Sequence, residues 1–309
     1  MSAHSRPRVA IGPRSVAFAE AAVVAGGGQL VGLGEHPEAL VWISPRHLPE
    51  LSRVVADTPT LRWVQLPLAG VERHFAAGVF DTSLVWTCAK GSYAQPVAEH
   101  AMALALAGLR RLHERVIAKT WGEPAGNTLY GAQVAILGGG GIAKELLRLL
   151  EPYSASTTVV RRSSEPLRGA TRTVGPGSLV EAVTSATVVF VALALTEQTR
   201  SIIDADALSA IGEQGWLVNV ARGAHVDTDA LVSALYDQTI AGAALDVTDP
   251  EPLPDGHPLW NAPNCIITPH TADTQEMVEP LLAARISTNV ARFAAGETLE
   301  GLVDTVSGY

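Results

Sequence analysis

A glycine-rich turn between an apolar strand pattern and a helical pattern constrains this chain most strongly. Residues 134–138 form a short apolar run, and Gly138, Gly140 and Ala143 follow at the spacing G-x-G-x-x-G/A. Residues 144–150 then have the pattern of an amphipathic helix. The first glycine permits a tight turn, the second lets a pyrophosphate approach the backbone, and the small third residue permits close packing. The free N–H groups at the helix start would bind the phosphates. The pattern predicts a dinucleotide-binding unit, although a plain strand–helix turn can look the same.

Apolar runs typical of short strands alternate with helical patterns along the 309 residues. Before the glycine turn they occur at 8–12, 29–33, 40–43, 61–66 and 84–87. From the turn onward they occur at 134–138, 157–160, 187–191, 215–220, 240–245 and 265–268. This alternation is typical of parallel α/β sheets. We expect an α/β fold of two doubly wound parallel-sheet domains, a Rossmann nucleotide-binding domain and a flavodoxin-like substrate domain, with an interdomain cleft.

Two long helical patterns set the expected domain boundaries. One covers residues 97–118, between the two series of strands, and the other covers about 274–295. Because the C-terminus can close a domain that the N-terminus began, we expect the last helix to return to the first domain. The predicted substrate domain is therefore 1–97 with 274–309, and the predicted dinucleotide-binding domain is 98–273.

Glu99 and His100 are neighbours in the first long helical pattern. Adjacent helix positions point in different directions, so we interpret both as structural residues rather than as a catalytic pair. The segment 121–129 contains Gly, Pro and Asn and is expected to be a linker or an arm.

Composition and charge exclude several classes of protein. The net charge of −9 argues against non-specific nucleic-acid binding. Cys88 and Cys265 lack metal-ligand spacing, so we expect buried thiols in a reducing compartment and no metal site. Arg14 and Glu20 interrupt the apolar N-terminal region, and no uncharged apolar run approaches the roughly 18 residues that span a bilayer. We expect a soluble cytoplasmic protein without a membrane partner.

The end of the second strand of the glycine-turn domain predicts which cofactor is bound. An NAD site usually has Asp or Glu at this point, to bind the ribose hydroxyls. Here the strand at 157–160 is followed by Arg161, Arg162 and Ser163, and no acid is present. Arginine forms bidentate contacts with phosphate. We therefore predict NADP as the cofactor, with NADPH preferred over NADH; the alternative is that both arginines are an ordinary solvated strand end.

Three later segments each follow a strand end: Val218-Asn-Val-Ala-Arg-Gly223, Ala244-Leu-Asp-Val-Thr-Asp-Pro-Glu-Pro-Leu253 and Ile267-Thr-Pro-His-Thr271. We expect them to open on the same crevice as the glycine turn. Together with that turn they resemble the D-isomer-specific 2-hydroxyacid dehydrogenase family, which includes glyoxylate/hydroxypyruvate reductases. The resemblance covers nearly the whole chain and is strongest from 131 to 271.

The resemblance implies a role for one residue in each segment. Arg222 would hold the substrate carboxylate and polarise its carbonyl, His270 would be the general acid/base, and Glu251 would be the carboxylate partner of that histidine. Asp246 would contact the nicotinamide carboxamide. The substrate carboxylate would also be bound by the backbone N–H groups of Ala69, Gly70 and Val71. The expected cofactor-binding residues are Gly138, Gly140, Gly141, Ile142, Arg161, Arg162, Ser163, Thr196, Val220, Ala221, Arg222, Asp246 and His270.

The proposed groups suit the reduction of a 2-oxo acid without reference to any family. Negative charge builds on the carbonyl oxygen as a hydride arrives, and an imidazolium can protonate that oxygen. A carboxylate beside the imidazole favours its charged form and fixes its tautomer. An arginine matches a planar carboxylate. Arg222, Glu251 and His270 could each instead be ordinary loop residues, whereas no G-x-S-x-G elbow supports a serine hydrolase.

Some positions depart from the family pattern. Residues 193–196 lack the usual proline before Thr196, and residues 271–273 are more polar than usual. Aromatic residues could line the substrate pocket or could simply be packed in the core: Trp86, Tyr93 and Trp260.

The sequence as a whole predicts an NADPH-preferring reductase of a small 2-oxo acid, of the glyoxylate or hydroxypyruvate type, that forms a D-2-hydroxy acid. The family usually dimerises through its nucleotide-binding domain, so a homodimer is expected. The alternative is a nicotinamide-dependent sensor or corepressor-like binding protein on the same fold.

Overall fold

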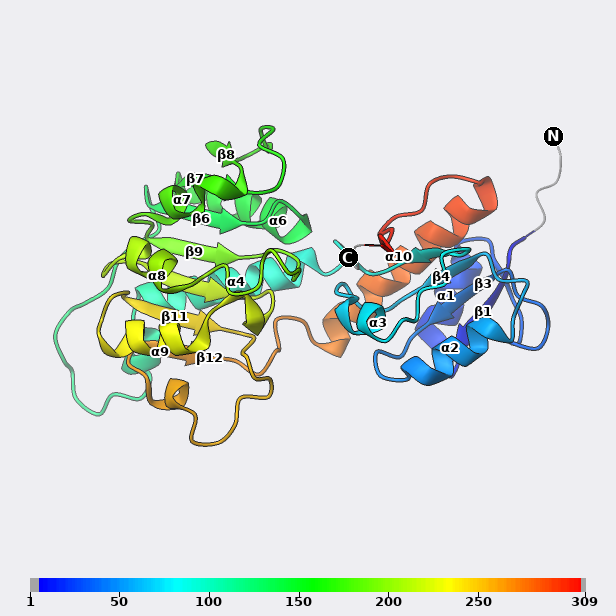
Figure 1. Cartoon of the computed structure of the whole chain (residues 1–309), viewed down its shortest axis with the longest axis horizontal. Coiled ribbons are helices and arrows are strands. Elements are labelled where there is room, and N and C mark those ends of the chain that lie inside the picture. Colours follow the sequence, from blue (N-terminus) through cyan, green and yellow to red (C-terminus); the bar gives the residue numbers. More distant parts are fainter. Residues whose placement is uncertain (1–5, 307–309) are drawn as a thin grey trace. The chain divides into compact units, whose positions relative to one another are not determined.

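The computed structural model describes residues 6–306, so the outermost ends of the first predicted domain lie outside the described residues. The chain divides into two compact units (Figure 1). Unit 1 is Met1–Tyr93 with Thr274–Tyr309, and unit 2 is Ala94–Asp273. Among the described residues, no helix is long and apolar enough to cross a membrane.

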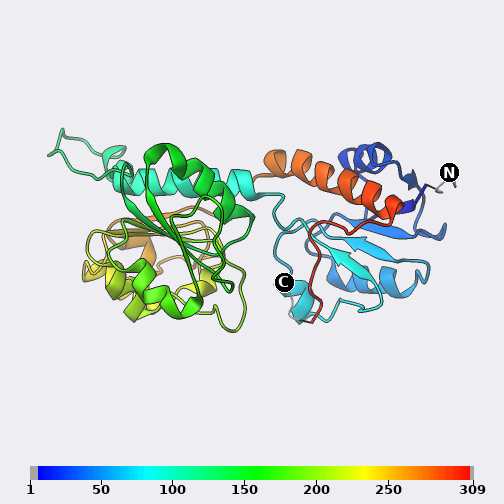
Figure 2. The same cartoon turned by 90° about the horizontal axis from the view of Figure 1, so that it is seen from above.

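Unit 1 is built on a five-stranded parallel sheet in the order β2-β1-β3-β4-β5, which is the flavodoxin-like order. The strands are β1 (Arg8–Gly12), β2 (Gln29–Leu30), β3 (Ala39–Trp42), β4 (Trp63–Gln65) and β5 (Val85–Thr87). The helices are α1 (Ala17–Ala25), α2 (Leu48–Ala56), α3 (Glu72–Ala76) and α10 (Gln275–Ala295). Helices α1 and α10 lie side by side on one face of the sheet, and α2 covers the other (Figure 2).

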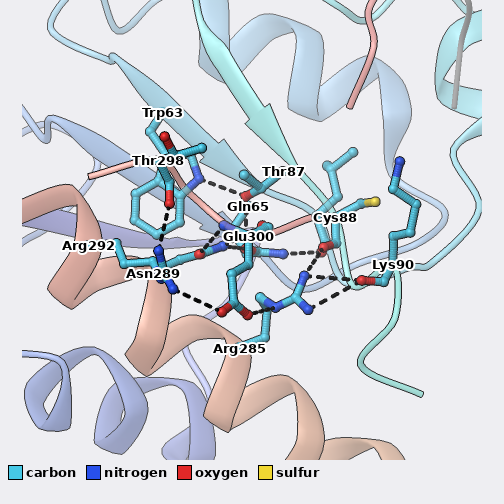
Figure 3. A network of polar contacts seen from close by, with 11 residues as sticks. Trp63, Gln65, Thr87, Cys88, Lys90, Arg285, Asn289, Arg292, Thr298 and Glu300 are labelled. Atoms are coloured by element: carbon cyan, nitrogen blue, oxygen red, sulfur yellow. Dashed lines mark hydrogen bonds and ion pairs between the residues drawn. The ribbon is translucent and has the colours of Figure 1, made fainter. Parts of the chain in front are cut away.

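A buried polar network joins α10 and the segment after it to the sheet of unit 1 (Figure 3). The Asn289 side chain donates to the Gln65 side chain and to the Glu300 carbonyl, both at 2.9 Å, and accepts from the Glu300 N–H at 2.8 Å. Thr87 Oγ1 donates to Gln65 Oε1 and accepts from Trp63 Nε1. Every buried amide and hydroxyl in this chain of contacts therefore has a partner, which is the condition for burying polar groups without a large cost.

Unit 2 contains a seven-stranded parallel sheet in the order β12-β11-β10-β9-β6-β7-β8. Six of its strands follow the Rossmann order, and β12 is added at one edge. The strands are β6 (Gln133–Leu137), β7 (Ser156–Val160), β8 (Arg172–Val174), β9 (Val188–Val191), β10 (Trp216–Asn219), β11 (Gly242–Leu245) and β12 (Cys265–Ile267). The two sheets confirm the predicted α/β class with two parallel-sheet domains.

Helices cover both faces of the unit 2 sheet (Figure 2). Helices α4 (Ala94–Leu109) and α6 (Gly141–Leu150) pack on each other on one face. On the other face, α7 (Leu179–Val183), α8 (Ala205–Ile211) and α9 (Thr228–Tyr236) pack in sequence. Their apolar residues form one core with the inward side chains of β9, β10 and β11. The sheet is thus buried on both sides, which explains why its strands are continuous apolar runs.

Some predicted elements differ from the observed ones. The helix expected over 97–118 ends at Leu109, because Arg111 has a left-handed backbone (φ 53°) that interrupts the helix before the short α5 (Leu112–Arg115). Strand β8 was not predicted, since its three residues show no apolar run. Residues 121–129 form no helix or strand, as the arm prediction expected.

Candidate active site

The glycine turn of unit 2 has the geometry that a bound pyrophosphate needs. Gly138 has φ +117°, and a Cβ there would lie 2.3 Å from the Ala192 carbonyl oxygen, so only glycine fits. Gly140 is the N-cap of α6, and a Cβ there would meet open space. Ala143 is fully buried against the strand. The first N–H groups of α6 receive no side-chain cap. The turn therefore fits the phosphates of a dinucleotide.

The end of β7 places a cation beside this turn. Arg161 is half-buried, and its aliphatic stem lies so close to Gly139 that a Cβ on Gly139 would be 2.8 Å from Arg161 Cδ. Arg162 is exposed, and Ser163 Oγ accepts a hydrogen bond from the Glu165 N–H. The guanidinium of Arg161 is thus held near the glycines, where a phosphate on the adenosine ribose could be contacted.

The other predicted cofactor residues lie at the carboxyl ends of strands or at the start of α6. Gly141 and Ile142 begin α6, Thr196 follows β9, and Val220 and Ala221 follow β10. The Thr196 N–H donates to Thr199 Oγ1 at 2.8 Å, which shapes the loop that lacks the family's proline. Because β6, β9 and β10 are neighbours in the sheet, these residues lie at the same sheet edge as the glycine turn.

Two residues that the sequence analysis did not select shape the loop of Arg222. Asn219 is fully buried; its amide donates to the Arg222 carbonyl at 2.9 Å and accepts from the Ala221 N–H at 3.0 Å. His225, which is also fully buried, accepts from the Arg222 N–H at its Nδ1. A Cβ at Gly223 would lie 2.0 Å from the Thr248 carbonyl, so this loop packs closely on the loop after β11.

Asp246 organises the loop that carries His270. Its Oδ1 accepts from the Thr268 hydroxyl at 2.6 Å and the Thr271 N–H at 2.9 Å, and its Oδ2 accepts from the Ala272 N–H at 3.0 Å. Its carbonyl accepts from the His270 N–H at 2.9 Å. Burial favours a raised pKa, but hydrogen bonds from His100, Thr268 and the two N–H groups outweigh it and lower the pKa of Asp246 to about 2.

His270 and Glu251 are brought together although 19 residues separate them. His270 Nδ1 lies 2.7 Å from Glu251 Oε1, and the other ring nitrogen makes no hydrogen bond within the described part of the chain. The backbone of His270 is left-handed (φ 51°), an uncommon conformation for this residue. Both side chains are partly exposed, at 47% and 38%. A histidine oriented in this way through Nδ1 can exchange a proton at Nε2.

The carboxyl of Asp273 is influenced by the charges of Arg222, His270 and Asp246. Burial raises the pKa of its carboxyl, and the charges of His270 and Arg222 act in the opposite direction. Such charge effects are strong only over a few ångströms. Asp273 belongs to the segment 271–273, which is more polar than the family pattern.

The predicted substrate loop of unit 1 follows β4. Ala69 is exposed, Gly70 is half-buried, and Val71 is buried in the core of the unit. Among the described residues, no group accepts a hydrogen bond from the N–H groups of these three residues. No hydrogen bond in the described part of the chain therefore competes with an anion for these N–H groups.

The three aromatic candidates have different surroundings. Trp86 is 1% exposed in the core of unit 1 and donates to the Asp81 carbonyl, so it is a packing residue and not a pocket wall. Tyr93 is buried and donates to the Pro67 carbonyl. Trp260 is half exposed on a short 3₁₀ helix (Pro258–Asn261) of unit 2.

Comparison with known proteins identifies the family. The model of the D-isomer specific 2-hydroxyacid dehydrogenase NAD binding domain matches residues 100–272. The chain belongs to the D-isomer specific 2-hydroxyacid dehydrogenase family. It is 40% identical over 260 residues to an uncharacterized protein in the proB 3′ region of Corynebacterium melassecola, with 82% of this chain and 86% of the relative covered.

Two further similar proteins indicate the kind of chemistry. Glyoxylate/hydroxypyruvate reductase A of Photorhabdus laumondii is 29% identical over 214 residues, which are 68% of each chain. A D-isomer specific 2-hydroxyacid dehydrogenase from Xanthobacter autotrophicus, solved in complex with NADPH and MES, matches with a TM-score of 0.84 at 25% identity over 99% of this chain and 100% of that chain. This 2-hydroxyacid dehydrogenase is thus an NAD(P)-dependent oxidoreductase of a family that acts on small 2-hydroxy or 2-oxo acids.

Proposed function

We propose that this dehydrogenase is an NADPH-preferring reductase that converts a small 2-oxo acid, of the glyoxylate or hydroxypyruvate type, to the D-2-hydroxy acid. The observation that carries the proposal is the 2.7 Å contact between His270 Nδ1 and Glu251 Oε1. It orients the imidazole through Nδ1 and leaves Nε2 available for proton transfer. The name of the Photorhabdus laumondii relative supports the choice of substrate class.

The proposed reaction uses three side chains of unit 2. A bound nicotinamide supplies the hydride. Arg222 forms a bidentate ion pair with the substrate carboxylate and polarises the neighbouring carbonyl. His270 donates the proton on Nε2 to the carbonyl oxygen as negative charge builds there, and Glu251 stabilises the imidazolium before transfer. The N–H groups of residues 69–71 are proposed to bind the substrate carboxylate.

The proposed cofactor contacts follow from the groups around the glycine turn. Gly138, Gly140 and the first turn of α6 would hold the pyrophosphate. Arg161 would bind the 2′-phosphate, with Arg162 and Ser163 next to it. Asp246, whose side chain is 1% exposed, is proposed to contact the nicotinamide carboxamide. The NADPH complex of the Xanthobacter autotrophicus dehydrogenase supports NADP as cofactor.

The test is the loss of nicotinamide absorbance with purified protein, with NADPH and NADH in parallel against glyoxylate, hydroxypyruvate, pyruvate and phenylpyruvate. Faster oxidation of NADPH with one of the first two acids is the expected result. Turnover with NADH alone would refute the role of Arg161. Tight NADPH binding without turnover of any acid would favour the sensor or corepressor alternative.

An Arg161→Asp variant separates the cofactor proposal from the rest. The substitution removes the phosphate partner and adds a carboxylate that suits ribose hydroxyls. The ratio of kcat/KM for NADPH to that for NADH should reverse or fall at least about tenfold, which corresponds to about 1.4 kcal/mol. An unchanged ratio contradicts the assignment. Arg168→Asp, an exposed change of the same charge nearby, is the matched control.

We also propose a homodimer that forms through the exposed apolar segment of unit 2. Val116 and Ile117 are more than two-thirds exposed, and Trp121 is 98% exposed. Large exposed apolar side chains close together in sequence are typical of an interface. Sedimentation analysis should give a dimer for the wild type and a monomer for Trp121→Ser; a wild-type monomer would contradict it. The cytoplasmic location stays a prediction.

A further inference from the structure

We propose that His100 is a positioning residue for the reductase reaction: from helix α4 it donates a hydrogen bond into the Asp246–Thr268 pair and so fixes the loop that presents His270. The inference rests on the proposed function. His100 lies in the first long helix of unit 2, 168 residues before Thr268, and sequence reasoning assigned it only a general structural role.

Hydrogen-bond donors and acceptors in this cluster determine the role of the imidazole. His100 Nε2 lies 3.1 Å from Thr268 Oγ1 and 3.3 Å from Asp246 Oδ1. The Thr268 hydroxyl has one proton, and its 2.6 Å contact with the Asp246 carboxylate uses that proton. Thr268 Oγ1 can therefore only accept from His100. It follows that His100 carries a proton on Nε2, which points at both oxygens.

This donor completes the set of contacts around a buried anion. The Asp246 side chain is 1% exposed and its pKa is held at about 2, so it is charged at neutral pH. Besides His100 and Thr268, its partners are the backbone N–H groups of Thr271 and Ala272. A buried carboxylate that loses one of four donors is stabilised less, and its remaining contacts rearrange. The imidazole of His100 is the only one of the four donors that lies outside residues 268–272.

The backbone around His270 depends directly on this anion. Thr268, two residues before His270, binds the carboxylate of Asp246. The same carboxylate is bound by the two residues that follow His270, Thr271 and Ala272. The His270 N–H binds the Asp246 carbonyl. His270 itself has the uncommon φ of 51°, which persists only where surrounding contacts impose it. A shift of about 1 Å in a catalytic group can cost about a hundredfold in rate.

The experiment compares His100→Leu, which has no donor, with His100→Gln, whose amide N–H reaches about as far as Nε2. Glu99→Gln, an exposed neighbour on α4, is the matched control. For each we measure kcat and KM for the 2-oxo acid, the Kd for NADPH, Tm, and hydrogen–deuterium exchange of the segment 265–275.

At a temperature well below Tm, we expect kcat of His100→Leu to be at least about tenfold lower than that of the wild type. KM and the Kd for NADPH should stay within about threefold of the wild-type values. Exchange at Thr271 and Ala272 should rise. His100→Gln should restore kcat to within about threefold of the wild type. A lower Tm with unchanged kcat, or equal losses in both variants, would overturn the proposal.

Failure of the proposed function gives a different result. If the wild type reduces no 2-oxo acid, the exchange measurement still decides whether His100 fixes the loop. Faster exchange at 271–272 in His100→Leu, with His100→Gln and Glu99→Gln like the wild type, would support positioning by His100. Unchanged exchange would overturn it.

Discussion

Each unit contains a buried polar network where a helix meets the carboxyl ends of strands, but the groups at the centres of the two networks differ in charge. In unit 1, Asn289, Gln65 and Thr87 form a chain of neutral amides and a hydroxyl (Figure 3). In unit 2, the centre is the carboxylate of Asp246, with His100 as a donor. The neutral network attaches α10 and its following segment to the sheet, whereas the charged one surrounds a histidine loop.

The difference concerns the energetic cost of each arrangement. Neutral amides lose little when they exchange water for each other, so such a network serves attachment. A buried carboxylate requires several donors to remain charged, and its partners are held firmly as a result. We infer that the charged network in unit 2 provides the rigidity that proton transfer at His270 requires, and that the neutral network in unit 1 contributes stability alone.

Of the four variants that test this comparison, Glu251→Gln is expected to have the largest effect. The amide keeps the size of the side chain but removes the charge that, in the proposed reaction, stabilises the imidazolium of His270. We expect kcat for the 2-oxo acid to fall about 100-fold while the Kd for NADPH stays within about threefold. Steady-state kinetics and a fluorescence titration measure both quantities. The exposed Asp255→Asn on the same loop is the control, and equal kcat in the two variants would contradict the role.

Asp246→Asn tests the charge of the unit 2 network through pH. The pKa of Asp246 is about 2 in the folded protein, below its ordinary value of 3.8. A lowered pKa stabilises the fold above about pH 4, and this stabilisation, about 2 kcal/mol, is lost as pH falls toward 2. Urea unfolding should therefore show the stability difference between wild type and variant shrinking over that range. A difference that does not depend on pH would show that Asp246 is not charged.

Asn289→Leu tests whether the neutral network serves stability alone. The substitution leaves the N–H and carbonyl of Glu300 without the partners they have now. We expect a loss of about 2 kcal/mol in the free energy of unfolding and kcat within about twofold of the wild type below Tm. A large fall in kcat with little change in stability would mean that the two networks do not divide these roles.

The smallest effect is expected from Arg292→Ala, at the surface of the same region. Arg292 contacts the Thr298 carbonyl at 3.1 Å and the Glu300 carboxylate at 3.4 Å, but its side chain is 37% exposed (Figure 3). Exposed ion pairs contribute little, so the loss should be below about 1 kcal/mol. Urea unfolding of Arg292→Ala and Asn289→Leu under the same conditions compares the two residues directly. A similar loss of unfolding free energy in both variants would contradict the distinction between buried and exposed contacts.

The fold class and the family could be predicted because both depend on local patterns. Short apolar runs that alternate with helices predict parallel sheets, and the observed sheets and the family match confirm this. The glycine spacing predicted a tight turn, and the φ of Gly138 and its contact with Ala192 explain why glycine is needed there. Residues after strand ends were good candidates, since parallel strands end at one edge.

Long-range partners could not be predicted in the same way. His100 binds Thr268 and Asp246 only because α4 packs against β10 and β11, which no spacing in the sequence encodes. The buried roles of Asn219 and His225 likewise depend on the folded loop of Arg222. The helix break at Arg111 also escaped prediction, because arginine is an ordinary helix residue.

The most direct test of the account is the kinetics of His270→Ala with NADPH and the best 2-oxo acid found for the wild type. We predict that kcat falls about 1,000-fold or more while the Kd for NADPH and Tm change little, because in the proposed reaction the exposed imidazole donates the proton, and it carries little of the fold. A variant that keeps more than a tenth of wild-type kcat would contradict the role of His270 and, with it, the proposed reaction.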